Sequence, residues 1–325
     1  TASNNTAVGL SALKANTTGT LNTAVGQNSG ASITTGIRNT TVGAASLDAE
    51  IAGNYSTAMG YGALSVQSNA SSADVYNTAV GYLAGAAVTT GTNNTLMGGA
   101  TGDAITTGSY NTAVGKDSLT ANTTAGYNTA VGYVSLRDNT TGATNTAVGS
   151  SALLQNTTGA SNVGVGANAL QANTTATANA ALGYSALYTN TTGANNTALG
   201  FEALALSTTA SNNTAVGKDA MRANTTGSQN VSVGTLSLAA NTTGSTGTAV
   251  GYEALGSNTT ASHNTAIGWR ALFANTTGDL NTAVGYGALD SNIIGDRAVA
   301  IGVGALNTQN VSGDTYNTAV GYSAG

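Results

Sequence analysis

The stretch Asn5–Leu21, NTAVGLSALKANTTGTL, recurs along the whole chain of 325 residues. The glycine that closes each NTAVG-like box recurs every 17 residues, with one step of 21 (Gly60 to Gly81) and one of 19 (Gly302 to Gly321). A short, regular period is typical of a solenoid, in which each repeat is one coil stacked on the last. The sequence therefore predicts a single repetitive domain over residues 1–325. Its 19 box glycines are Gly9, Gly26, Gly43, Gly60, Gly81, Gly98, Gly115, Gly132, Gly149, Gly166, Gly183, Gly200, Gly217, Gly234, Gly251, Gly268, Gly285, Gly302 and Gly321.

We number each repeat from its box glycine as position 0. Position −1 is always aliphatic, −2 is nearly always Ala, −3 is usually Thr, and +4 is Leu in 14 repeats. Thr and Val disfavour helix and Asn competes for backbone hydrogen bonds, so TAVG predicts a short strand. We expect a second strand from +3 into the NTT run, and turns with positive φ at the glycines at 0 and +10. The fold class is therefore all-β, a parallel β-solenoid.

Stacking identical coils about 4.8 Å apart places like residues above one another and predicts a rod on the order of 90 Å long. Two columns of asparagine follow, whose amides can donate and accept along the stack. The first, at −4, includes Asn5, Asn22, Asn39, Asn77, Asn94 and Asn111. The second, at +7, includes Asn16, Asn122, Asn139, Asn156, Asn173, Asn190, Asn224, Asn241, Asn258, Asn275 and Asn292. We interpret both columns as structural.

Each coil offers only two sizeable aliphatic side chains, at −1 and +4. We expect these to fill the inside of the roll, and the Ala and Gly face to pack against other chains, with the reverse assignment left open. A strand that is apolar on both faces is usually covered on both. The partner that we expect is therefore the chain itself, as a homotrimer.

Composition excludes several function classes. Charged residues make up 6% of the chain and the net charge is −5, which argues against nucleic acid and anionic membranes as partners. Cysteine is absent, which excludes disulfides and thiolate metal sites, and no segment has the length and apolarity of a membrane span. We expect no cofactor and no metal. The chain begins without Met, and we interpret it as a fragment of a longer fibre.

Boxes such as TAVGYEAL (Thr248–Leu255) and NTAIGWRAL (Asn264–Leu272) resemble the head repeats of trimeric autotransporter adhesins of the YadA type. The fuller form, NTAVG-x-x-AL-x-x-NTTG, is also similar to repeats of phage tail fibres. The resemblance covers essentially the whole chain and implies a left-handed parallel β-roll that trimerises. The period of 17 is longer than the usual adhesin head repeat, and we expect no stalk, neck or membrane anchor within residues 1–325.

Aromatic residues recur at position +1 and supply the candidate binding residues. Exposed rings there could stack on the sugars of a cell-surface glycan or could cover a groove between coils or chains. The +1 residues are Tyr61, Tyr82, Tyr133, Tyr184, Phe201, Tyr252, Trp269, Tyr286 and Tyr322. A second set just before the box comprises Tyr55, Tyr76, Tyr110, Tyr127 and Tyr316.

No catalytic constellation is apparent. The only histidine, His263, has no Cys and no carboxylate nearby in the sequence, and we expect it on the surface. Asp117, Asp138 and Asp219 adjoin basic residues, and none of these pairs gathers two carboxylates in one coil, as glycoside hydrolysis would require. Four irregular segments are expected to form loops that stand off the coils: Asp48 to Tyr55, Val66 to Tyr76, Asp290 to Arg297 and Asn307 to Tyr316.

The sequence thus favours a non-enzymatic, extracellular rod segment of a virion fibre or a bacterial surface adhesin, which spaces or presents receptor-binding elements for host attachment. The alternatives are a repeat surface that binds host glycans or ice, and a tailspike-like depolymerase. Interruptions of the −3 threonine column count against ice. A depolymerase would need acidic residues such as Glu202 and Glu253 to gather across a chain boundary.

Overall fold

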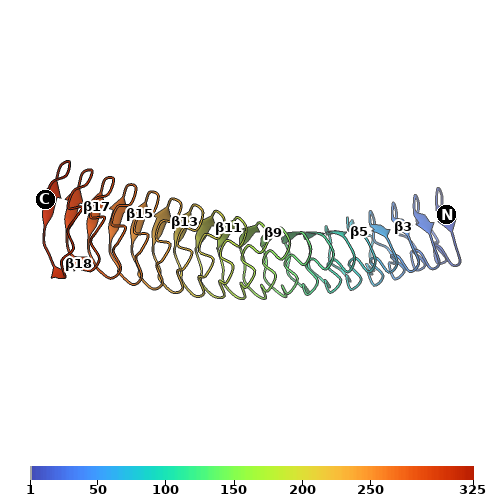
Figure 1. Ribbon diagram of the computed structural model, residues 1–325. Coiled ribbons are helices and arrows are strands. Elements are labelled where there is room, and N and C mark those ends of the chain that lie inside the picture. The colour runs from blue at the N-terminus through green and yellow to red at the C-terminus, as the bar shows by residue number, and fades with distance from the viewer. Residues whose placement is uncertain (1) are drawn as a thin grey trace. The chain divides into compact units, whose positions relative to one another are not determined.

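The computed structural model describes residues 2–325, and over this range the protein is a parallel β-solenoid of about 19 coils without any helix (Figure 1). The chain divides into two compact units, the first ending at Ser161 and the second beginning at Asn162. Each unit is a stack of coils with the repeat of 17 residues seen in the sequence. The expectation of one continuous domain over residues 1–325 stays a prediction.

The strands of each unit are three residues long and come from the TAV part of the box. Unit 1 contains β1 (Thr6–Val8), β2 (Thr23–Val25), β3 (Thr40–Val42), β4 (Thr57–Met59), β5 (Thr78–Val80), β6 (Thr95–Met97), β7 (Thr112–Val114), β8 (Thr129–Val131) and β9 (Thr146–Val148). Unit 2 contains β10 (Val163–Val165), β11 (Ala180–Leu182), β12 (Thr197–Leu199), β13 (Thr214–Val216), β14 (Val231–Val233), β15 (Thr248–Val250), β16 (Thr265–Ile267), β17 (Thr282–Val284), β19 (Val299–Ile301) and β21 (Thr318–Val320). Unit 2 also has two two-residue strands, β18 (Gly295–Asp296) and β20 (Gly313–Asp314).

Neighbouring coils pair in parallel and in register, so that like residues stack. In β7 and β8, for example, Thr112 pairs with Thr129 and Val114 with Val131. The pairing therefore confirms the predicted stacking of identical positions within each unit.

The expected second strand is wrong. The segment from 0 to +7 instead forms two successive tight turns, in which Ser118 N–H donates to Gly115 C=O and Asn122 N–H to Leu119 C=O. The turns are also bonded to the next coil, because Leu119 N–H donates to Ser135 C=O at 3.0 Å. The turns give the backbone N–H and C=O groups hydrogen-bond partners, as a second column of paired strands would have done.

The two glycine positions have different roles. At position 0, Gly115 has φ +135°, and a Cβ there would lie 2.4 Å from the carbonyl oxygen of Gly132 in the next coil. Glycine is thus required for both the dihedral angle and the close approach. At +10 the expectation of positive φ is wrong, since Gly142 lacks it and Ala125 occupies the equivalent place. The +10 residue is small because its Cβ points at the next coil's carbonyl.

The faces of the strand are the reverse of those expected. Ala at −2 points inward and is fully buried, as in Ala113 and Ala130, whereas Thr at −3 and the aliphatic residue at −1 point outward. Met97 at −1 is 43% exposed. In most coils the inside holds Ala at −2, a small residue at +3 and Leu at +4, and the fully buried Leu96 at −2 occurs where +4 is glycine. Because the aliphatic residue at −1 points outward, the prediction that it fills the roll is wrong.

Both asparagine columns are buried and structural, as predicted. Asn128 at −4 and Asn139 at +7 donate from their Nδ2 atoms to the same acceptor, the carbonyl of Gly142, at 3.0 and 2.9 Å. The amide oxygen of Asn128 accepts the backbone N–H of Asn145 in the next coil. Each such pair therefore ties its own coil across the core and links it to its neighbour.

Three coils of unit 1 exchange the contents of positions +4 and +7. Where +4 is glycine, the +7 asparagine is replaced by a fully buried aliphatic residue: Gly30 with Ile33, Gly85 with Val88, and Gly102 with Ile105. A Cβ on Gly30 would lie 3.0 Å from Ile33 Cδ1, so the second side chain fills the space that the first one leaves. The core volume is kept while the residues change places.

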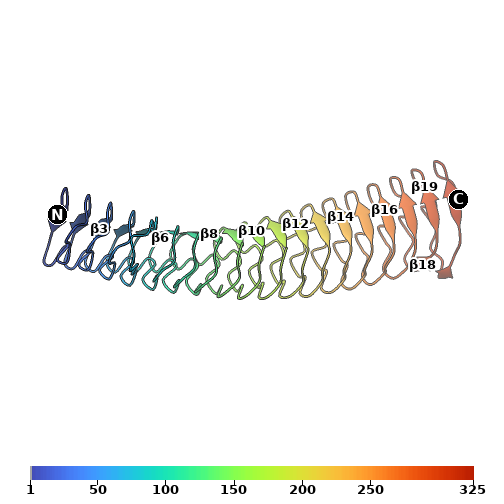
Figure 2. The ribbon, with the colours of Figure 1, turned by 180° about the vertical axis from the view of Figure 1, so that it is seen from behind.

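The four irregular segments are joined in two pairs by parallel backbone pairing between neighbouring coils. Asn54 and Asp74 form a parallel bridge between the first two segments. Likewise β18 pairs with β20, joining Asp290–Arg297 to Asn307–Tyr316. Figure 2 shows β18 at the edge of the coils opposite β19, and Figure 1 shows it at the edge opposite β17.

Candidate functional site

All nine candidate aromatic residues lie at the end of their strands, directly after the turn glycine, and project outward. Their exposed fractions run from 41% in Trp269 to 82% in Tyr322. Because coils stack in register, rings in consecutive coils meet face to face. The structure therefore arranges the candidates as a column along each unit.

Most of these rings stack on one another. Unit 1 has the pair Tyr61–Tyr82, with centroids 5.8 Å apart. Unit 2 has the pair Tyr184–Phe201 at 5.4 Å and a run of three rings. In that run Trp269 lies 6.4 Å from Tyr252 and 4.6 Å from Tyr286. Ring faces inside a stack are covered, so a sugar can reach only the edges and the end faces.

Tyr133 and Tyr322 stand outside these stacks. Lys116 Nζ lies 5.9 Å from the centroid of the Tyr133 ring, a cation–π contact. Tyrosines just before the box also stack in pairs, as the +1 rings do. Tyr55 stacks on Tyr76 at 5.0 Å, and Tyr110 on Tyr127 at 4.9 Å.

A charged cluster adjoins the three-ring run of unit 2. Arg270 Nε lies 3.3 Å from Asp290 Oδ1 and 4.0 Å from Glu253 Oε2, and its guanidinium packs 4.1 Å from the ring centroid of Phe273. Burial raises the pKa of Asp290, Arg270 opposes this rise, and Glu253 adds to it. The pKa of the Tyr252 hydroxyl is also raised, and the largest cause is its hydrogen bond with Glu253.

A second cluster centres on Arg222. Its Nε lies 2.5 Å from Glu202 Oε2 and 3.8 Å from Asp219 Oδ1. With Tyr184 and Tyr188, Glu202 and Arg222 line a hollow of ≈ 280 Å³. In both clusters an arginine pairs with two carboxylates, at least one of them from a neighbouring coil, which suits ion pairing better than acid–base catalysis.

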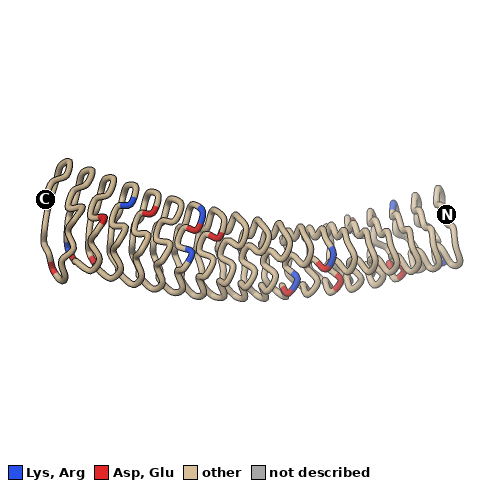
Figure 3. Tube along the Cα trace, in the orientation of Figure 1, with Lys and Arg blue, Asp and Glu red and all other residues tan. Residues whose placement is uncertain are grey.

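Sequence reasoning missed these three-residue clusters because it looked within single coils. The members of each cluster occupy positions +2 and +5, over two adjacent repeats around Arg222 and over three around Arg270. Charges are otherwise few and scattered over both units, as Figure 3 shows. The expected neighbour pairs are present, with Lys116 3.1 Å from Asp117 and Arg137 2.7 Å from Asp138.

Sequence reasoning also missed a buried carboxylate in unit 1. Glu50 replaces the +7 asparagine and is fully buried. Its Oε1 accepts four backbone N–H groups, from Ile51, Ala52, Gly53 and Asn69, at 2.7–3.1 Å. Its Oε2 accepts the side-chain amides of Gln67 and Asn69. The carboxylate thereby organises the first two irregular segments, a structural role.

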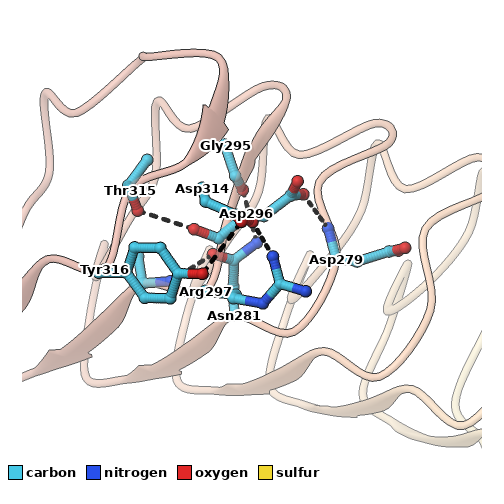
Figure 4. Close-up of polar contacts among 9 residues, drawn as sticks. Asp279, Asn281, Gly295, Asp296, Arg297, Asp314, Thr315 and Tyr316 are labelled. Carbon is cyan, nitrogen blue, oxygen red and sulfur yellow. Dashed lines mark hydrogen bonds and ion pairs between the residues drawn. The ribbon is translucent and has the colours of Figure 1, made fainter.

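Figure 4 shows the acidic residues of the last coils. Asp296 Oδ1 accepts the backbone N–H of Asp279 at 2.7 Å, and Asp279 Oδ1 accepts that of Ser262 at 2.6 Å. Asp314 pairs with Arg297 and accepts the Tyr316 hydroxyl at 3.0 Å. These carboxylates are engaged by protein donors and continue a ladder that Ser and Asn side chains provide in other coils.

Among residues 2–325, no group of three or more His, Cys, Asp or Glu side chains is placed to hold a metal ion. His263 is exposed, as expected. Over the same range, no helix is long and apolar enough to cross a membrane. Neither a protein-family model nor a curated protein sequence matches this chain.

Proposed function

We propose that this chain is a non-enzymatic extracellular fibre segment, of a phage tail fibre or a bacterial surface adhesin, that spaces or presents receptor-binding elements. The observation that carries the proposal is that the two repeated asparagine positions and two further repeated polar positions serve stacking. Asn at −4 and +7, Thr at +8 and Ser at +11 each bond within the coil or to the next one. A chain whose repeated polar side chains form hydrogen bonds within and between its own coils is suited to bearing a load or setting a distance.

Three chains make up the proposed fibre. The support is the outer sheet face, where aliphatic residues at −1 form a continuous column in each unit. The Thr column at −3 beside it is unbroken in unit 1 and is interrupted in unit 2 by Val163, Ala180, Val231 and Val299. Parallel sheets usually have both faces covered. This face replaces the Ala and Gly face as the seam between chains, because the Ala side chains lie inside each coil.

The test is the mass of the chain in solution, measured by light scattering and sedimentation. We expect about three times the chain mass of 31.5 kDa. The double variant Val114→Lys/Val131→Lys places charge on the outer face and should give folded monomers. Ser150→Lys is the matched control, since lysine already occurs at +1 in Lys116. A wild-type chain that is fully folded as a monomer would overturn the trimer, and release of reducing ends from a host glycan would overturn the non-enzymatic assignment.

Unit 1 favours one alternative, an ice-binding surface. Its −3 column is threonine in all nine strands, from Thr6 to Thr146, beside the aliphatic −1 column. A regular array of hydroxyl and methyl groups could order water, but only if sister chains leave this face open. Thermal hysteresis together with a monomeric mass would favour ice binding, and a trimer without hysteresis would favour the fibre.

A further inference from the structure

The aromatic column of unit 2 has a single-coil gap near its end. Tyr252, Trp269 and Tyr286 occupy position +1 in three consecutive coils, Val303 occupies it in the next, and Tyr322 in the one after. Valine is much smaller than tyrosine, so the column is hollowed at this coil. The hollow measures ≈ 390 Å³ and is lined by Tyr286, Val303, Tyr322, Asn307 and Ser323, among others.

The spacing of the solenoid sets the width of this gap. Two repeats of about 4.8 Å separate the Tyr286 and Tyr322 positions by roughly 9.6 Å. Stacked rings lie about 4.5–7 Å apart, so one ring fits between the two faces at the lower end of this range. Trp269 stacks on the other face of Tyr286 at 4.6 Å and 8°, which holds that ring across the column.

We propose that Tyr286 and Tyr322 form a slot for one pyranose ring of a β-linked saccharide whose ring hydroxyls are all equatorial, as in a glucan. Such a ring presents C–H groups on both faces and can stack on two aromatic rings at once. An axial hydroxyl would press a polar group against one ring without a partner.

The rim of the slot supports a saccharide over a purely aromatic ligand. Asn307 Nδ2 donates to Gly287 C=O at 3.0 Å, which fixes the amide with its oxygen as an acceptor for a sugar hydroxyl. Thr308 and Ser323 are exposed hydroxyl residues beside it. The net charge of −5 counts against phosphate-bearing rings such as nucleotides. This site goes beyond the fibre role, and it needs no second chain.

The test uses the full chain with cellohexaose as the probe and mannohexaose, which has an axial 2-hydroxyl, as the control sugar. Binding is followed by calorimetry and by the fluorescence of Trp269, the only tryptophan, which stacks on Tyr286. We expect cellohexaose to bind with a dissociation constant at or below about 1 mM, and at least about tenfold more tightly than mannohexaose.

Three variants distinguish binding in the slot from nonspecific binding. Val303→Tyr completes the aromatic column and fills the slot, and Tyr322→Ala removes one wall, so each should weaken cellohexaose binding at least about tenfold. Tyr61→Ala removes an exposed stacked ring in unit 1 and should leave binding unchanged. Unchanged near-ultraviolet dichroism of Trp269 verifies the fold of Val303→Tyr. Wild-type affinity in a folded Val303→Tyr, equal affinity for the two sugars, or no binding of cellohexaose would each overturn the proposal.

Discussion

Unit 1 and unit 2 build the same coil with different contents. In unit 1 three coils exchange Leu and Asn for Gly and an aliphatic residue, and a fourth buries Glu50. In unit 2 the leucine position varies little, but the outer face does: Val163 and Ala180 interrupt the threonine column and leave an apolar hollow of ≈ 280 Å³ beside Leu182.

The comparison shows which features the coil requires. The turn glycine at 0 and the inward small residues at +3 recur in both units, whatever fills the rest of the core. Backbone geometry and the distance between coils are therefore fixed. The side chains at +4 and +7 are exchangeable as a pair, provided that their combined volume is kept.

The largest expected effect comes from breaking the fixed feature. Gly98→Ala should destabilise unit 1 by more than about 3 kcal/mol, because φ is +144° and the new Cβ would lie 2.5 Å from Gly115 C=O. The adjacent Gly99→Ala is the control, since nothing lies within 4 Å of its Cβ. Thermal melts followed by circular dichroism should separate the two variants, and equal melting temperatures would contradict the requirement for glycine.

A double-mutant cycle tests the exchange of core residues. Ile33→Asn alone should cost about 2–4 kcal/mol through the cavity that it leaves. Adding Gly30→Leu should restore most of this, because leucine at +4 has φ near the +56° of Gly30 and Asn at +7 offers a donor to the unpartnered Asn16 Oδ1. Denaturant unfolding measures the coupling. Additive effects would show that the two positions do not share one space.

A substitution that makes the +7 asparagine column of unit 2 more regular should be stabilising. Ser207 occupies +7, and its buried hydroxyl has no partner, nor has Oδ1 of Asn190 in the preceding coil. Ser207→Asn should supply the missing donor and raise stability by about 1–2 kcal/mol. The reverse change, Asn224→Ser, should be destabilising by a similar amount. A lower melting temperature for Ser207→Asn would contradict this account of the column.

The smallest expected effect depends on pH. Burial raises the pKa of Asp103 above its ordinary 3.8, and Asp117 adds to the rise. The folded state then binds this proton more tightly, so stability falls as pH rises from 3.8 through the folded pKa. Asp103→Asn should therefore raise stability near neutral pH by less than about 1 kcal/mol and should lose this advantage below pH 3.8.

Melting curves across this pH range provide the measurement. Asp290→Asn in unit 2 is the comparison, since there the substitution also removes the partner of Arg270 and should gain less. An Asp103→Asn advantage that persists at low pH would show that the buried charge is not the cause.

The repeat was enough to predict the fold class, the number of coils and the two asparagine columns. It failed on the direction of the strand faces, because Thr, Ala and Val alternate identically whichever face is inside. It also failed on the second strand, since two tight turns that also bond to the next coil satisfy the backbone equally well. The aromatic column was readable from the spacing, but which rings stack and where one is missing became visible only with consecutive coils in place.

By itself, the sequence determined that glycine, a short strand and paired asparagines recur every 17 residues, because each depends on the local dihedral angles and hydrogen bonds of the backbone. Only the tertiary structure decided which residues are inside, how Arg270 pairs with Glu253 and Arg222 with Glu202 of a neighbouring coil, and where Val303 opens the column. These features depend on the width of the coil and on contacts one period apart. Such contacts exist only after the coils have stacked.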